Sequence, residues 1–106
     1  MNDIQFCEAQ KGDLKYIVQM LADDPLGIKR ERFESPLPSS YSNAFDSIDK
    51  DSNNALILAI LKDEIIGVLQ LTFIPNLTYQ GSWRAMIEGV RVSSKFRSKG
   101  IGQSLI

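Results

Sequence analysis

The chain has 106 residues, 43% of them hydrophobic and 24% charged, with a formal net charge of −1. These totals fit one small globular domain, and the balanced charge gives no basic field for DNA or RNA, so no nucleic-acid partner is expected. The sequence contains no histidine, which excludes imidazole metal sites, Ser-His-Asp triads and Cys-His dyads, and no metal is expected.

The N-terminal segment predicts a short strand in a cytoplasmic protein. Residues 3–9 alternate apolar and polar side chains, and Cys7, the single cysteine, is expected to be a buried thiol there. The letters MNDIQ place an acid where a signal peptide would be basic. Apolar runs along the chain fall short of the ~20 residues of a membrane helix, so no membrane partner is expected.

Two amphipathic helices are predicted next, with a surface segment between them. Apolar residues recur at helical spacing from residue 14 to 21, after a turn and N-cap at Gly12-Asp13, and this helix should end before Pro25. From residue 24 to 40 the composition turns to Pro, Ser and mixed charge, which is typical of a connecting loop. The pattern of a second helix then follows at Tyr41, Ala44, Phe45 and Ile48.

The remainder of the chain predicts three strands in a meander. Residues 55–61 and 65–74 are apolar on both faces and are separated by three charged residues, which indicates a tight antiparallel hairpin within a sheet. A polar loop is expected over residues 76–84 and a further strand over residues 85–92. The order strand, helix, helix, three-strand meander, helix is that of an α+β domain and not of alternating βαβ units.

After the last strand, the letters RSKGIG at residues 97–102 place two cations and two glycines before a helix start. Backbone N–H groups that converge at a helix N-terminus form an anion site, and glycine allows close approach. Phosphate or pyrophosphate is the natural ligand, and a purely structural turn is the alternative. The loop has neither the third glycine of the dinucleotide fingerprint nor the Gly-Lys-Ser/Thr order of the nucleotide P-loop.

The strand before this loop carries a carboxylate in an apolar row. Desolvation by such neighbours raises a carboxyl pKa and suits a general base, a role we consider for Glu88; pairing with Arg84 or Arg91 is the alternative. Gly89 predicts a bulge that frees backbone groups for an extended ligand, or else a plain packing glycine. Simple alternation puts four side chains on one face: Met86, Glu88, Val90 and Val92.

The letters IEGVRV at residues 87–92, followed by R-x-x-G-x-G at residues 97–102 and a helix, resemble the acetyl-CoA signature of the GNAT superfamily of N-acetyltransferases. The upstream order of elements resembles that family too. The resemblance implies a GNAT-like acyl-CoA N-acyltransferase fold over residues 1–106, as a single domain. Complete members continue through further strands and helices, so the chain is expected to be the N-terminal part of such a domain, with the C-terminal part missing.

The resemblance also implies a reaction. Acetyl-CoA would be the co-substrate, and a primary amine of a small molecule or peptide would attack its thioester carbonyl directly, without a metal. Glu88 matches the strand position where several members carry the acid that deprotonates the amine. Two other interpretations stay open. One is a catalytically inert acyl-CoA or anion-binding module, and the other is a fragment that pairs its last strand with a second copy as a homodimer.

Binding residues follow from the same resemblance. The strand would bind the pantetheine arm through backbone groups of Val90, Arg91 and Val92. The acceptor pocket would be bordered by Tyr41, Tyr79 and Trp83, for which ordinary half-buried aromatic packing is the alternative. The pyrophosphate would be held by the loop residues Arg97, Ser98, Lys99, Gly100, Ile101, Gly102 and Gln103.

Overall fold

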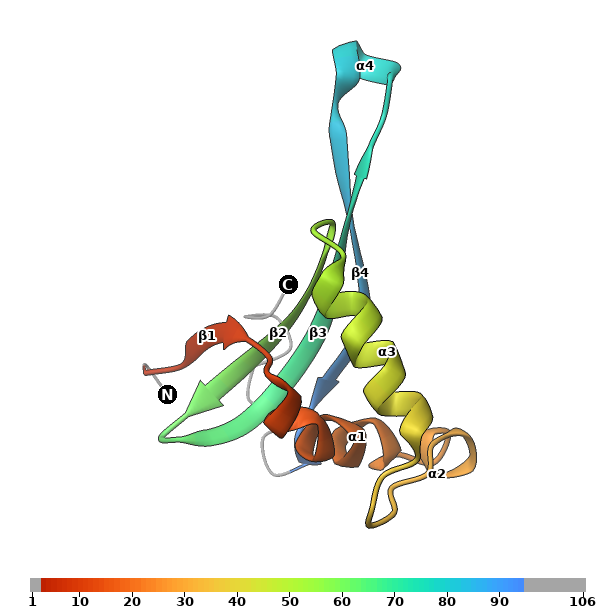
Figure 1. Ribbon diagram of the computed structural model, residues 1–106. Helices are drawn as coiled ribbons and strands as arrows, with labels where there is room; N and C mark the ends of the chain where they lie inside the picture. The colour runs from red at the N-terminus through yellow and green to blue at the C-terminus, as the bar shows by residue number, and fades with distance from the viewer. Residues whose placement is uncertain (1–2, 95–106) are drawn as a thin grey trace.

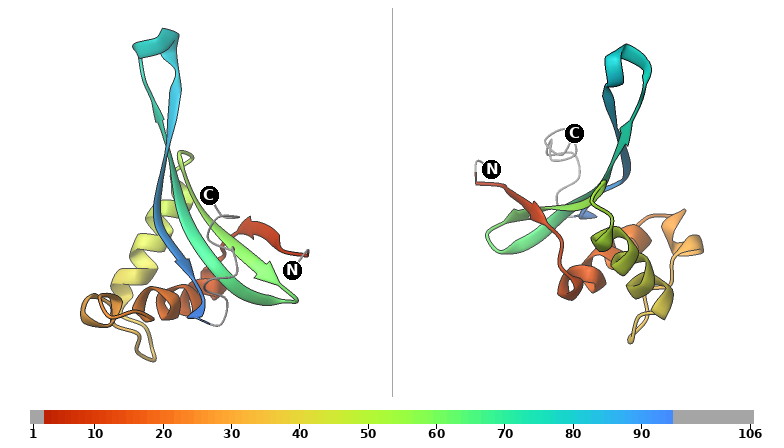
Figure 2. Two further views of the ribbon diagram at one scale, coloured as in Figure 1. Left: turned by 180° about the vertical axis from the view of Figure 1, so that it is seen from behind. Right: turned by 45° about the horizontal axis from the view of Figure 1, so that its top comes forward.

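The computed structural model describes residues 3–94, which form a four-stranded antiparallel sheet with helices on one face (Figures 1 and 2). The strands lie in chain order, β1-β2-β3-β4. In this described part no helix is long and apolar enough to cross a membrane. The elements are β1 (Gln5–Glu8), the 3₁₀ turn η1 (Lys11–Asp13), α1 (Leu14–Ala22), α2 (Gly27–Arg30), α3 (Ser39–Lys50), β2 (Asn54–Leu61), β3 (Glu64–Pro75), α4 (Thr78–Gly81) and β4 (Trp83–Val92).

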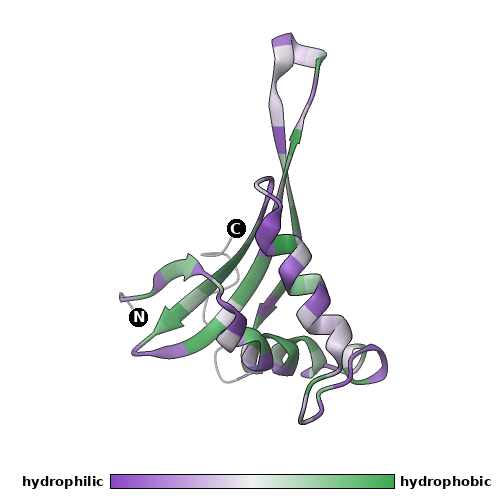
Figure 3. Cartoon of the chain, viewed as in Figure 1, coloured by the Kyte–Doolittle hydropathy of each residue, from purple (hydrophilic) through white to green (hydrophobic). Residues whose placement is uncertain are grey.

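The β2–β3 hairpin is confirmed as the centre of the sheet. Its strands pair from Asn54↔Thr72 to Leu61↔Glu64. Lys62 and Asp63 connect them with φ of 50° and 65°, the left-handed pair that matches the twist of a two-residue hairpin turn. Because both strands are interior in the sheet, they can carry apolar side chains on both faces. Figure 3 shows hydrophobic residues along much of both strands.

The main core lies between the sheet and the helices. Ile17 from α1 and Phe45 from α3 pack there with Leu58 and Val68 of the sheet, and all four are at most 6% exposed. The two predicted helices are therefore confirmed, and each turns its apolar stripe to this face. A smaller cluster on the opposite face of the sheet is built around Ala59 and Ile66, with Ile4, Leu61 and Val92 packed against it.

The prediction of a buried thiol at Cys7 is wrong. Cys7 lies on β1, an edge strand whose four residues are all exposed. Its cross-strand partner Leu58 is buried, but β1 has a neighbour on one side only. The alternation of side chains predicted the strand correctly. It does not show that the strand lies at the edge of the sheet, and this position decides whether Cys7 is buried.

The segment expected to be a loop between the helices contains the short helix α2. The Asp24 carboxylate accepts a hydrogen bond from the Gly27 N–H, and the Ile28 N–H donates to the Asp24 carbonyl at 2.9 Å. An aspartate that satisfies the first N–H groups in this way starts a helical turn. The turn packs so closely that a Cβ on Gly27 would lie 2.0 Å from the Leu21 carbonyl oxygen.

Gly27→Ala should therefore destabilise the fold by about 1 to 3 kcal/mol, because the new methyl group must push α2 away from α1. Urea unfolding measures this loss. Gly12→Ala is the matched control, since a Cβ there would have no atom within 4 Å, and it should unfold at nearly the same urea concentration as the parent. Equal urea midpoints for the two variants would show that the close approach at Gly27 does not affect the free energy of unfolding.

β3 and β4 continue beyond the rest of the sheet as a two-stranded ribbon (Figure 1). Their pairing runs out to Pro75↔Trp83, so the loop expected over residues 76–84 is shorter than predicted. The ribbon ends in α4, where Tyr79 and Gln80 take left-handed φ values of 52° and 62°. Both views in Figure 2 show this tip projecting away from the helices.

Candidate functional site

β4 contains a bulge at Gly89. Glu88 pairs with Gln70 and Arg91 pairs with Val68, so β4 takes one residue more than β3 over the same length. Gly89 has a φ of +62°, and a Cβ there would meet nothing within 4 Å. Close packing is therefore not the reason for the glycine. Of the two alternatives, the bulge is confirmed, and glycine supplies its left-handed backbone.

The bulge changes which side chains share a face. Cross-strand partners point to the same side of a sheet, so Arg91, opposite Val68, faces the helices as Glu88 does. Val92 pairs with Gly67 and packs against the cluster on the other face. The prediction that Met86, Glu88, Val90 and Val92 share one face is therefore wrong, because the extra residue reverses the alternation after Gly89.

Glu88 is exposed, at the edge of the helix face. The expected desolvation by apolar neighbours is not found among the described residues. The alternative of an ion pair with Arg84 or Arg91 is not found there either, since Arg91 pairs with Asp24 instead. Glu88 thus stands beside Gln70 and the bulge, where its carboxylate can be reached from outside the sheet.

Asp24 and Arg91 connect the helices to β4 just after the bulge. Arg91 Nε lies 3.5 Å from Asp24 Oδ2, and both side chains are about three-quarters buried. Arg91 Nη1 also donates to the Val90 carbonyl at 2.8 Å, while its buried Nε lacks a hydrogen-bond partner within the described protein. The Gly27 N–H lowers the pKa of Asp24; partial burial opposes this shift and the Arg91 charge adds to it. The carboxylate therefore stays ionised and holds the guanidinium on the backbone of β4.

An apolar groove of about 150 Å³ lies next to the bulge, between α1 and α3. Its floor is formed by the helix face of the sheet, including Val68, Gln70 and Gly89. Leu21 on α1 and Ala44 on α3 belong to its walls. The groove therefore brings a concave apolar surface to the same short stretch of β4 that carries Glu88.

Tyr41, predicted to contact the acceptor, lines this groove. Its hydroxyl donates to Glu31 Oε1 at 2.7 Å and accepts a hydrogen bond from the Arg32 backbone N–H at 3.0 Å. Partial burial raises the pKa of Tyr41. The hydrogen bond from the Arg32 N–H opposes this shift, and the Glu31 carboxylate adds to it. The phenol therefore stays protonated, and it fixes the segment between α2 and α3 at one end of the groove.

Tyr79 and Trp83 are not brought together with Tyr41. Tyr79 lies in α4 and Trp83 begins β4, at the far end of the β3–β4 pairing, and they are 90% and 60% exposed. Within one chain they do not line the groove that Tyr41 borders, so the described residues do not bring the three predicted aromatic side chains together. The sequence places them in a turn but does not show how far the ribbon extends from the body.

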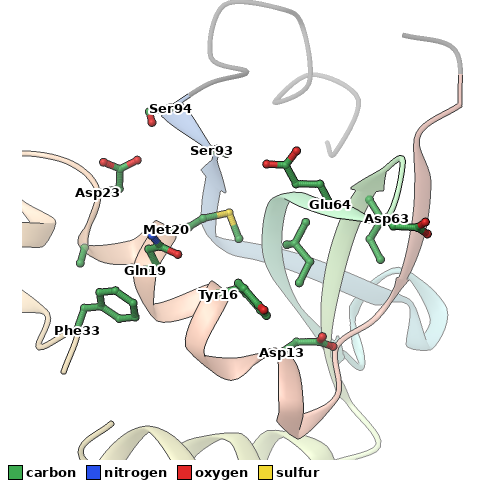
Figure 4. A pocket seen from close by; sticks show the side chains of 13 residues that line it. Asp13, Tyr16, Gln19, Met20, Asp23, Phe33, Asp63, Glu64, Ser93 and Ser94 are labelled. Atoms are coloured by element: carbon green, nitrogen blue, oxygen red, sulfur yellow. The ribbon is translucent and has the colours of Figure 1, made fainter. Parts of the chain in front are cut away.

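A larger cavity of about 860 Å³ lies on the other side of α1, toward the end of β4 (Figure 4). Tyr16 and Phe33 line it together with Ser93 and Ser94. Its described lining holds no cationic side chain, and these residues therefore do not favour an anionic ligand. The carboxylates in this lining are Asp13, Asp23, Asp63 and Glu64.

The described residues include three of the predicted cofactor-binding residues. Val90, Arg91 and Val92 form the last, half-buried part of β4, at the edge of the sheet. The predicted pyrophosphate loop, Arg97 to Gln103, lies outside the described residues. Within the described part, no group of three or more Cys, Asp or Glu side chains is placed to hold a metal ion.

Two parts of the site were missed by sequence reasoning. Asp24 belongs to the segment treated as a loop, and only the Asp-x-x-Gly spacing to Gly27 hints at its capping role. The groove uses residues that were predicted as helix and strand core, such as Leu21 and Val68. Periodicity identifies such residues as apolar but does not tell a filled interface from a hollow one.

Comparison with known proteins agrees with this architecture. A solved structure described as a transcriptional regulator from Bacillus halodurans C-125 is 60% identical, with a TM-score of 0.90 over 96% of this chain and 68% of that chain. Glucosamine-6-phosphate N-acetyltransferase from Arabidopsis thaliana is 15% identical, with a TM-score of 0.72 over 97% and 69% of the two chains. A predicted acetyltransferase with acetyl-CoA from Clostridium acetobutylicum is also 15% identical, with a TM-score of 0.68 over 96% and 68%.

The two more distant structures share the fold with this chain. A search of curated proteins gave no significant match. The model of the acetyltransferase (GNAT) family matches residues 17–106, a range that begins within the first predicted helix and includes the second helix, the bulged strand and the glycine loop. The resemblance noted in the sequence is thereby confirmed, and the chain belongs to the GNAT family of acetyltransferases.

Proposed function

We propose that the protein transfers the acetyl group of acetyl-CoA to a primary amine at the groove beside the β4 bulge. The observation that carries the proposal is the juxtaposition of three features on one stretch of edge strand: the left-handed bulge at Gly89, the accessible carboxylate of Glu88, and an apolar groove. Family membership supplies the reaction class.

Residues of this chain fit the co-substrate at the bulge. A bulge leaves backbone N–H and C=O groups unpaired on the edge of a sheet, where an extended chain such as pantetheine can hydrogen-bond to them. Val90, Arg91 and Val92 would supply these groups, and the loop from Arg97 to Gln103 would hold the pyrophosphate. Bound there, acetyl-CoA supplies an activated acyl thioester.

The acceptor would react from the groove. Its neutral amine nitrogen attacks the thioester carbon, a C–N bond replaces the C–S bond, and coenzyme A leaves as a thiolate that takes up a proton from water. The proton lost by nitrogen passes to the Glu88 carboxylate, directly or through water. Tyr41 would border the bound acceptor. Much of the acceleration would come from holding the two reactants together, since orientation can supply about 7 to 11 kcal/mol of a barrier.

The solved structure that is 60% identical is described as a transcriptional regulator. A net charge of −1 gives this chain little attraction for a phosphate backbone, and the described cavity with four carboxylates would repel one. Acetyl transfer is therefore the function that the described site supports best.

The proposal is tested by mixing the protein with acetyl-CoA and a panel of primary amines, with products detected by mass spectrometry. Colorimetric thiol reagents are unsuitable because Cys7 is exposed. We expect acetylated amine and free CoA in equal amounts, with saturation in both substrates. Saturable acetyl-CoA binding without acetylated product would instead indicate an inert binding module.

The Asp24–Arg91 pair should position the co-substrate. Asp24→Asn keeps an oxygen that can accept the Gly27 N–H but removes the charge that holds Arg91. We expect KM for acetyl-CoA to rise roughly three- to tenfold with kcat nearly unchanged, because the backbone after the bulge is less well held. Initial rates at varied acetyl-CoA measure both constants.

Asp46→Asn is the matched control for this substitution. Asp46 on α3 forms an exposed ion pair with Lys11 of η1 at 3.0 Å. The control removes the same charge from an ion pair outside the site, and KM should not change. An equal rise of KM in both variants would mean that net charge, and not the tie to β4, governs co-substrate binding.

A further inference from the structure

The groove between α1 and α3 has the size and lining of a site for a small apolar group. Its volume of about 150 Å³ corresponds to roughly five water molecules at their share of the liquid volume. Among the described residues that line it, Tyr41 and Gln70 carry polar groups, and the other side chains are aliphatic or phenyl. Such a surface favours guests that lose apolar area to it.

A carboxylate lies close to the part of the groove that is lined by β3 and the bulge. Gln70 lines it beside the bulge, and Glu88 is the cross-strand partner of Gln70 on the same face of the sheet. Directly opposed Cβ atoms in such a pair lie about 4.5 to 5.5 Å apart. A guest with one amine and an apolar body would therefore meet a carboxylate there and aliphatic walls along its length.

A charged body would fit this groove poorly. A second ammonium group or a carboxylate would lose its hydration against side chains such as Leu21 and Ile48, with no described partner of opposite charge in the lining. The carboxylates that would attract a polycation line the other cavity, together with Ser93 and Ser94 beyond the end of β4. None of these four carboxylates lies on the stretch of β4 that carries Glu88.

We infer that the acceptor is a primary amine on a compact aliphatic group of about four to six carbon atoms, seated in the groove with its nitrogen toward Glu88. This inference rests on the proposed function, because it names the acceptor class of the same reaction. It goes further in assigning specificity to the groove walls. Ala44 on α3 is both exposed and part of the lining, so it controls the width at the rim.

The test is a homologous series of unbranched amines from methylamine to octylamine. We expect kcat/KM to rise about fourfold with each added methylene until about five carbons, because each buried methylene contributes a similar increment of binding, and then to level off. Pentylamine and 1,5-diaminopentane form a matched pair of ligands. The diamine should react at least about tenfold more slowly at equal concentration, because its second charge would be desolvated.

Two variants test the location. Ala44→Phe should fill the groove from its rim and flatten the rise of kcat/KM with chain length. Asn43→Phe adds the same ring to the neighbouring exposed residue, which does not line the groove, and should keep the full rise. Circular dichroism checks folding, and Ala44→Leu replaces the phenylalanine variant if that variant unfolds.

The outcomes separate this inference from the proposed function. If amines are acetylated but the parent shows no rise with chain length, or prefers the diamine, the acceptor assignment is wrong and acetyl transfer stands. A full rise that survives in a folded Ala44 variant also overturns the assignment to this groove. If no amine is acetylated while acetyl-CoA binds, the proposed function itself fails.

Discussion

Glu88→Gln should lower kcat about 10²-fold while KM for acetyl-CoA stays nearly the same. Glutamine keeps the size and polarity of the side chain but cannot take the proton that the amine loses, and a general base typically contributes 10²- to 10⁴-fold. Cross-strand pairing with Gln70 is retained, so the strand should keep its register. Steady-state rates at saturating acetyl-CoA measure the effect, with the acidic limb of the pH–rate profile as a second readout.

Glu8→Gln is the matched control, because Glu8 is an exposed acid on β1, at the opposite edge of the sheet. It should leave kcat and the pH–rate profile unchanged. Glu88→Asp should retain part of the activity, since it restores a carboxylate one methylene further back. A Gln variant with the parental rate and profile would remove Glu88 from the chemistry and leave it as a surface residue.

Gly89→Val should lower kcat/KM at least about 10²-fold. The residue at this position has a φ of +62°, a conformation that costs an L-residue about 1 to 2 kcal/mol and a β-branched residue more. Relief of that strain would close the bulge and return Arg91 to the face away from Asp24. Both the backbone groups for the co-substrate and the position of Glu88 would then be lost.

Gly81→Val separates this local effect from general destabilisation. Gly81 also has a left-handed φ, of +78°, and the nearest atom to a Cβ there is 3.9 Å away. It lies at the tip of the ribbon, so its valine variant should lose comparable stability in thermal unfolding and keep kcat/KM. If both variants lose activity in proportion to their stability, the bulge has no specific role at the site.

Much of the fold could be predicted because local patterns determine it. Helical spacing identified α1 and α3, and two apolar runs around Lys62 and Asp63 identified the central hairpin. Each pattern predicts which face of a helix or strand packs against the core, and the elements pack together through these faces. The glycine within the last strand also indicated the bulge.

The site was harder to predict because it depends on relations between distant segments. The extra residue at the bulge turns Arg91 toward Asp24. Simple alternation along the strand does not predict this orientation. Cys7 is exposed because β1 lies at the edge of the sheet, and the position of Trp83 depends on the length of the ribbon. The groove exists because α1 and α3 leave space above the sheet, which sequence periodicity does not record.

The most direct test of a co-substrate site at the bulge is an amide NMR titration of the protein with acetyl-CoA. We predict saturable shifts of the Gly89 and Val90 amides and the neighbouring amides of β4, with the amides of the ribbon tip unmoved. Desulfo-CoA, which lacks the thioester, should move the same signals through its pantetheine arm. Saturable binding that leaves Gly89 and Val90 unperturbed, or no binding at all, would contradict the assignment of this site.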